Sequence, residues 1–103
     1  MYSKFRALGT QELIDLIQSG KLPPEEATYA AEVLGSKGRE PEIFECLFKL
    51  LMHPSAVLRE GAILGIGAQK IPDFCRTHLE WISKNDVSPS VRQTALENLG
   101  VSL

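Results

Sequence analysis

Few residues in this sequence could do chemistry, and the best-spaced pair is Cys75 and His78. Residues three apart on a helix share a face, so this thiol and imidazole could touch as a nucleophile and its base. A nucleophilic enzyme also needs a group that orients the base and donors for the oxyanion, and neither accompanies this pair. We therefore expect His78 to be a packed imidazole. We expect Cys75 and Cys46 to be buried free thiols, with a single disulfide between them as the less favoured alternative.

Two other sets of polar residues have a structural interpretation that outweighs the catalytic one. His53 precedes Pro54, as a turn or cap residue does, and neither histidine stands at metal-ligand spacing from a cysteine or another histidine. The adjacent Glu25 and Glu26 are typical of the acids that stabilise a helix N-terminus. An acid and base pair would require a cleft and a defined separation between the carboxyl groups.

The spaced glycines Gly61, Gly65 and Gly67 resemble a phosphate-binding run only superficially. In a phosphate loop such glycines follow a strand and open a helix, whereas these lie within and at the end of a helical pattern. We interpret them as positions of close helix packing. The sequence thus predicts no catalytic residue, no metal site and no cofactor.

The composition is that of an ordinary folded protein of 103 residues, with 44% hydrophobic and 23% charged residues. It predicts a single domain over residues 1–103. The formal net charge of −2 disfavours nucleic acid as a partner, because phosphate-binding proteins usually carry a basic excess. No apolar stretch is long enough to span a membrane. No apolar run follows Lys4 and Arg6, as it would in a signal peptide, so we expect a cytoplasmic protein.

The elements that position these residues are expected to be about six helices. Apolar residues recur at helical spacing, no segment alternates as a strand does, and no hairpin turn signal occurs. Proline, glycine and N-cap residues, such as Thr10 at the start of the first segment, divide the pattern. The expected helical segments are 10–19, 23–35, 40–53, 55–67, 72–85 and 88–100.

An internal repeat organises these segments into three helical hairpins, over about residues 10–35, 40–67 and 72–100. Ala30, Ala62 and Ala95 recur at offsets of 32 and 33 residues. Each is followed four residues later by an aliphatic residue that should fill the core, and then by glycine. The aliphatic residues are Leu34, Ile66 and Leu99, and the glycines are Gly35, Gly67 and Gly100. We expect the alanines at close helix crossings and the glycines as left-handed residues that end each second helix.

The third repeat resembles the second half of a HEAT repeat. Asp86, Pro89, Val91 and Arg92, followed by Ala95, Leu99 and Gly100, match that family's pattern. The middle repeat matches at Pro54, Leu58, Arg59, Ala62, Ile66 and Gly67, and the first only at Ala30, Leu34 and Gly35. The resemblance implies a short right-handed α-solenoid whose second helices line a concave face. It also implies that Asp86 and Arg92 hydrogen-bond structurally between neighbouring turns.

The concave side of that solenoid is the expected protein-binding surface. In the repeat, positions two before and two after each alanine should face outward. The expected strip is Thr28, Glu32, Arg59, Glu60, Leu64, Gln93 and Glu97, with a structural role as the alternative for Arg59. It is mildly acidic, with Leu64 as an apolar anchor. The alternative is a solvated helical face with one tolerated leucine.

A second candidate surface is formed by Phe74 and Trp81 in the last repeat. If both are exposed, they mark a patch for a partner or for a twin subunit. If residues 101–103 fold over the end of the stack, Trp81 makes a cap contact instead.

These features together predict a non-catalytic protein-interaction module, such as an adaptor, a scaffold or an assembly factor. The alternative is a small acidic inhibitor or immunity-type protein that occludes a basic enzyme such as a nuclease. A HEAT-like nucleic-acid-binding protein ranks lower, because the lysines and arginines near turns are scattered: Lys21, Lys37, Arg39, Lys70 and Lys84. A HEAT-like lyase ranks last, because no complete catalytic set is present. A homodimer through the C-terminal repeat is a further option.

Overall fold

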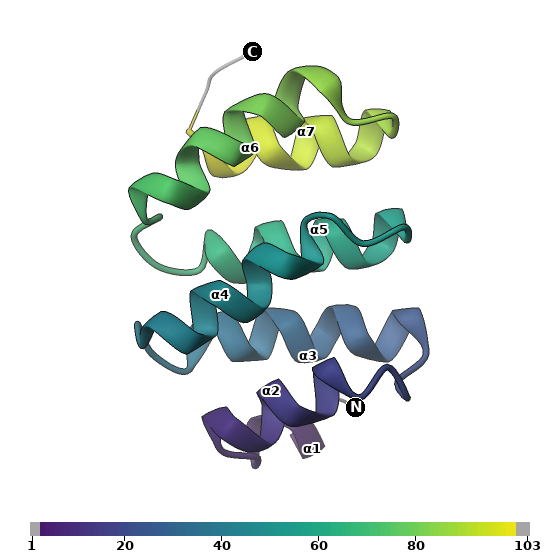
Figure 1. Ribbon diagram of the computed structural model, residues 1–103, viewed down its shortest axis with the longest axis vertical. Coiled ribbons are helices and arrows are strands. Elements are labelled where there is room, and N and C mark those ends of the chain that lie inside the picture. Colours follow the sequence, from purple (N-terminus) through teal and green to yellow (C-terminus); the bar gives the residue numbers. More distant parts are fainter. Residues whose placement is uncertain (1–2, 101–103) are drawn as a thin grey trace.

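A computed structural model describes residues 3–100, and all the regular secondary structure in that range is α-helical (Figure 1). The prediction of an all-helical chain is therefore confirmed. The six predicted segments correspond to the last six helices of the described range. In this part of the chain no helix has the length and apolar character to cross a membrane. The helices are α1 (Ser3–Arg6), α2 (Thr10–Gln18), α3 (Pro24–Ser36), α4 (Pro41–Leu50), α5 (Ala56–Ile66), α6 (Asp73–Asn85) and α7 (Pro89–Asn98).

The helices lie in two layers. Figure 1 shows α3, α5 and α7 one above another in a row, with α2, α4 and α6 in front of them, and α3 contacts α5 while α5 contacts α7. The molecule measures 36 × 25 × 22 Å, so the row is only modestly elongated. Its radius of gyration, 12.6 Å, is that of a compact domain of this length.

The core lies between the two layers and contains the apolar residues of the predicted helical stripes. Ala30, Ala62 and Ala95 are completely buried, and Leu99 is partly buried against the core. The largest side chains in the core, all under 2% exposed, are Phe5, Leu13, Leu34, Ile43, Leu47, Ile63, Ile66, Leu79, Ile82 and Val91. Burying this apolar surface is what stabilises helices too short to persist alone in water.

Helix α1 has no counterpart among the predicted segments. A single turn of four residues shows no periodicity, and such a helix persists only where tertiary contacts hold it. Phe5 is 1% exposed, and the ammonium of Lys37, the C-cap residue of α3, donates to the Arg6 carbonyl at 2.5 Å. Lys4 also pairs with Glu26 at 2.8 Å on the surface. These contacts join α1 to α3.

The start of α2 differs from the prediction that Thr10 caps it. The N-cap is Gly9, whose backbone N–H donates to the Glu12 carboxylate at 2.9 Å, and Thr10 is the first helical residue. Glu12 therefore satisfies the free N–H at this end from inside the helix. Ser55 and Ser88 act as side-chain caps of α5 and α7.

Glycines let α3 and α5 approach closely, which confirms the packing interpretation of Gly65. A Cβ added there would lie 2.6 Å from the Ala31 carbonyl oxygen, and one at Gly35 would overlap the Gly65 backbone. A Cβ at Gly61 would overlap Thr28. The closest contact between α3 and α5 is thus made by Gly35, Gly61 and Gly65, and the alanines expected there, Ala30 and Ala62, are buried beside it.

The prediction that repeat glycines end the second helices in a left-handed conformation holds only for Gly100, with φ +76°. Gly35 lies inside α3, and Gly67 has a right-handed φ of −77°. Gly35 is needed instead because the backbone of α5 occupies the space of a side chain. Gly67 faces the Asn98 side chain of α7. Gly20, after α2, does have a positive φ of 71°.

A buried ion pair connects the α6–α7 loop to α5. The Asp86 carboxylate accepts from Nε and Nη2 of Arg59, both at 2.9 Å, and Nη1 of Arg59 donates to the carbonyls of His53 and Pro54. The Arg92 guanidinium donates to the Asp86 carbonyl at 2.5 Å. The Asp86 carboxylate therefore bonds to Arg59 of α5, whereas Arg92 of α7 holds the backbone of the loop that precedes its own helix.

Burial by itself would raise the pKa of Asp86, but its hydrogen bonds and positive neighbours outweigh burial. The Arg59 guanidinium and the Ser88 backbone N–H donate to the carboxylate, and the charges of Arg59 and Arg92 lie close to it. Together they hold the pKa of Asp86 below its ordinary value. The carboxylate is therefore ionised at neutral pH.

Replacing Asp86 with asparagine should destabilise the fold by about 3 kcal/mol at pH 7, because it leaves the buried Arg59 charge without a counterion. Urea unfolding followed by circular dichroism measures the loss. The exposed carboxylate Glu80 provides the matched control, since Glu80→Gln removes the same charge and should change stability by less than about 0.5 kcal/mol. Equal stabilities of the two variants would contradict this role for the pair.

The sign of the pH dependence follows from the lowered pKa of Asp86. An unfolded aspartate has a pKa of about 3.9. The stabilisation from a carboxylate with a lower folded pKa is present above that value, and it is lost as the pH falls through the folded pKa. The stability difference between the wild-type chain and Asp86→Asn should therefore be constant near neutral pH and shrink below about pH 4. A difference that persists unchanged in strong acid would contradict the assignment.

Replacing Gly65 with alanine should destabilise the fold by about 2 kcal/mol, although alanine is the better helix former. The added methyl group would meet the Ala31 carbonyl, which cannot move without displacing α3. Gly67→Ala is the matched comparison, because its methyl group meets the side chain of Asn98, which can rotate. Thermal unfolding should rank Gly65→Ala clearly below Gly67→Ala, and the reverse order would refute the close approach of the helices.

Candidate functional site

The expected binding strip divides into exposed and buried residues. Leu64 is 41% exposed in the last turn of α5, and Gln93 and Glu97 are exposed on α7. Glu32 of α3 and Glu60 of α5 are half-buried. These five residues come from α3, α5 and α7, the three adjacent helices of one row.

Thr28 takes part in the contact between α3 and α5. Its hydroxyl donates to the Val57 carbonyl at 3.0 Å, and its side chain fills the space next to Gly61. The residue is half-buried, and its hydroxyl already has a partner. Thr28 therefore joins two helices, and this role sets it apart from the exposed part of the strip.

Arg59 does not lie on the surface, so its inclusion in the strip was wrong. Its side chain is buried, and its guanidinium donates to Asp86 and to two backbone carbonyls. The structural alternative for this residue is the one observed. Without Arg59, the strip contains no basic side chain.

Val57, which the strip did not include, enlarges the apolar part of this surface. It is 45% exposed and lies seven residues before Leu64, so both side chains project from the same face of α5. The i, i+7 spacing is the signal in the sequence that could have identified it. We define the second-helix face as Glu32, Val57, Glu60, Leu64, Gln93 and Glu97.

The acids of the second-helix face differ in their surroundings. The Glu60 carboxylate accepts a hydrogen bond from the Ser90 hydroxyl, which links α5 to α7. Burial raises the pKa of Glu32. A cation next to this carboxylate would favour its ionised form and compensate for the lost hydration.

Phe74 and Trp81 are 51% and 56% exposed on α6, in the layer away from the second-helix face. Four rings form a continuous series between α4 and α6. Phe48 lies 5.4 Å from Phe74 and 5.2 Å from His78, and His78 stacks on Trp81 with centroids 5.7 Å apart. Phe48 and His78 are half-buried, so the rings form one surface. The predicted cap over Trp81 involves residues 101–103, which lie outside the described part of the chain.

The cysteines are free and buried, as predicted. Burial raises the pKa of Cys75 to about 11, so its thiol is protonated at neutral pH. His78, three residues away, packs between the rings of Phe48 and Trp81. Burial also raises the pKa of Cys46, and the charge of Lys49 opposes that shift. Over residues 3–100, no group of three His, Cys, Asp or Glu side chains is arranged to hold a metal ion.

Trp81 is the only tryptophan of the sequence, so intrinsic fluorescence reports on the aromatic surface directly. With more than half of the side chain exposed, acrylamide should quench the folded protein nearly as efficiently as the unfolded chain. A twin subunit that covers the patch would instead make the quenching decrease as protein concentration rises. Strong protection at every concentration would show that Trp81 is covered within one chain.

Comparison with known proteins gives no relative from which a function could be inferred, so the proposed function rests on the geometry of this chain. No family model, no curated protein and no solved structure matches it. The resemblance of the third repeat to a HEAT repeat therefore stays a prediction from Asp86, Pro89, Val91, Arg92 and the residues that follow them.

Proposed function

We propose that this chain is a non-catalytic protein-interaction module that binds a protein partner through the second-helix face. The observation that carries the proposal is the pair of exposed aliphatic side chains on α5, Val57 and Leu64. They lie in the middle helix of the row, and Glu32, Glu60 and Glu97 extend over all three helices. An apolar centre with a polar rim is the usual anatomy of a protein-binding surface.

The chemistry of the face indicates the chemistry of the partner. Burying Val57 and Leu64 against apolar side chains would supply most of the affinity, since a few central anchors dominate most interfaces. The acidic rim would favour lysine or arginine around the partner's apolar patch and would increase the association rate. The proposed partner is therefore a protein that presents apolar residues within a basic surface.

We further propose that the six helices α2 to α7 form a HEAT-like stack of three hairpins. The recurrence of buried alanines on α3, α5 and α7 supports this arrangement. So does the pair formed by Arg59 and Asp86, which would join the second helix of one hairpin to the loop between the two helices of the next. In such a stack the second helices line one side, and partners of α-solenoids commonly bind there.

The second candidate function is an acidic inhibitor or immunity-type protein that occludes a basic enzyme. It is favoured by the absence of basic side chains among the six residues of the second-helix face. In this case charge would dominate recognition, and long-range attraction would accelerate association. The two candidates differ in how strongly binding depends on salt.

Leu64→Arg tests the second-helix face with little risk to folding, because the side chain is already 41% exposed. The tagged wild-type chain and the variant are used in parallel to capture proteins from the source cells, followed by quantitative mass spectrometry. A partner of this face should be lost with Leu64→Arg and retained with Glu80→Gln, which changes a charge on α6. With the purified partner, Leu64→Arg should weaken binding at least about tenfold, or 1.4 kcal/mol. Equal capture by wild type and Leu64→Arg would refute the proposal.

The salt dependence of association with that same partner separates the two candidate functions. An association rate that falls steeply between low and physiological salt favours the inhibitor of a basic enzyme. A rate that changes little with salt, together with the loss caused by Leu64→Arg, favours the apolar docking module.

A further inference from the structure

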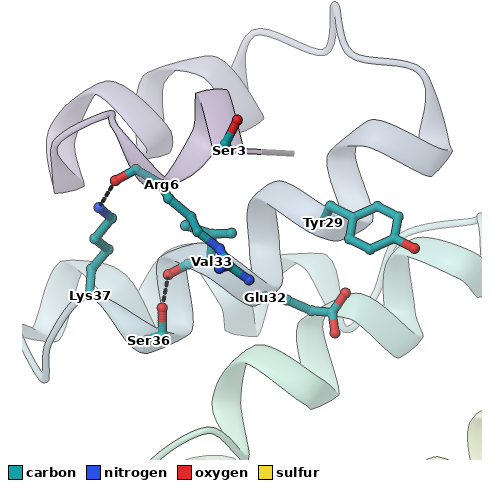
Figure 2. A pocket seen from close by; sticks show the side chains of 7 residues that line it. All are labelled: Ser3, Arg6, Tyr29, Glu32, Val33, Ser36 and Lys37. Atoms are coloured by element: carbon teal, nitrogen blue, oxygen red, sulfur yellow. Dashed lines mark hydrogen bonds between the residues drawn. The ribbon is translucent and has the colours of Figure 1, made fainter. Parts of the chain in front are cut away.

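A cleft of about 790 Å³ lies between α1 and the face of α3 that α1 only partly covers (Figure 2). Its volume is within the range of small-molecule sites in proteins. The lining residues are Ser3 and Arg6 of α1, Tyr29, Glu32, Val33 and Ser36 of α3, and Lys37, which directly follows α3. The walls combine charged and hydroxyl groups with a larger share of apolar surface, which suits a small ligand that carries both charged groups and an apolar side chain.

The cleft contains opposite charges that do not neutralise one another. Figure 2 shows the Arg6 side chain extending from α1 past Val33 toward Glu32. Among residues 3–100, neither the Arg6 guanidinium nor the Glu32 carboxylate takes part in an ion pair or a hydrogen bond. The Arg6 guanidinium, as a hydrogen-bond donor, and the Glu32 carboxylate, as an acceptor, are thus both available to a ligand.

The remaining walls define the middle and the ends of the site. Val33 provides an aliphatic surface between the two charged groups, and the Tyr29 ring, 43% exposed, lies at one end. At the other end the Lys37 ammonium is held by the Arg6 carbonyl at 2.5 Å, which keeps α1 in place and adds positive charge on the side of Arg6.

We propose that this cleft binds a free α-amino acid, with the ligand carboxylate on Arg6 and the ligand ammonium on Glu32. A guanidinium binds a carboxylate through two parallel hydrogen bonds, and a carboxylate accepts readily from an ammonium. The ligand side chain would lie against Val33 and Tyr29, which favours an apolar or aromatic amino acid. This site goes beyond the proposed protein-binding function: it shares Glu32 with the second-helix face, but it requires Arg6, which lies outside that face.

The surroundings of Glu32 support the ammonium position. Burial disfavours the ionised form of this carboxylate in the free protein, which raises its pKa. A bound ammonium would supply the missing positive neighbour and stabilise the ionised form. The carboxylate would then gain from the ligand the pairing that it lacks in the free protein.

The test is a titration of the isotopically labelled full chain, monitored by amide NMR signals, with three probes of the same shape. L-phenylalanine carries both charges, phenethylamine only the ammonium, and 3-phenylpropanoate only the carboxylate. We expect phenylalanine to shift signals of α1 and of residues 29–37, with a dissociation constant of about 1 mM or lower, and each single-charge probe to bind at least about tenfold more weakly. Equal binding of the three probes, shifts confined to other parts of the chain, or no saturable shift would each overturn the proposal.

Variants assign the two charges. Arg6→Gln and Glu32→Gln should each weaken phenylalanine binding at least about tenfold, whereas Arg6→Lys, which keeps the charge, should restore part of the affinity. Glu80→Gln, on α6, removes a carboxylate outside the cleft and should leave binding unchanged. Unaltered binding by Arg6→Gln or by Glu32→Gln would refute the assignment.

Leu64→Arg should abolish partner capture without affecting phenylalanine binding, so the two proposals fail or survive separately.

Discussion

The close approach of α3 to α5 is the constraint on which the rest of the structure depends. Gly65 lies against the Ala31 carbonyl, and the backbone of Gly65 fills the place where Gly35 would carry a side chain. A helix pair at such short range brings its outward residues near each other, so α3, α5 and α7 form one continuous surface. The carboxylates of Glu32 and Glu60 belong to one face for this reason.

The buried pair of Arg59 and Asp86 determines the charge of that surface. Arg59 comes directly before Glu60 in the sequence, yet its guanidinium turns inward to Asp86 and to two loop carbonyls. A buried ion pair adds little net stability compared with apolar residues, but removing one partner is costly. The same interaction that joins the α6–α7 loop to α5 therefore removes the one basic side chain of the strip and leaves its exposed part acidic.

Most of the fold was predictable because its signals are local. Apolar spacing with proline and serine at helix starts identified α2 to α7, and the alanine repeat identified which helices share a row. Apart from the cap of α2, which depends on the local contact of Gly9 with Glu12, the misassignments involve contacts over long sequence distances. Gly35 was interpreted as a helix end because its partner Gly65 lies thirty residues away, Thr28 was placed outward although it bonds to Val57, and α1 depends on Phe5 and Lys37.

The sequence by itself determined that the chain is helical, which residues form the core, and that its two thiols are buried and free. These properties follow from the spacing of the apolar residues, which is read directly from the sequence, and from the free-energy cost of exposing apolar surface to water. Only the tertiary structure decided which polar residues reach the surface. Arg59 and Leu64 lie on the same helix, but Arg59 is buried and bonded to Asp86, whereas Leu64 is exposed. The cleft of Arg6 and Glu32 likewise exists only because a short N-terminal helix docks on α3.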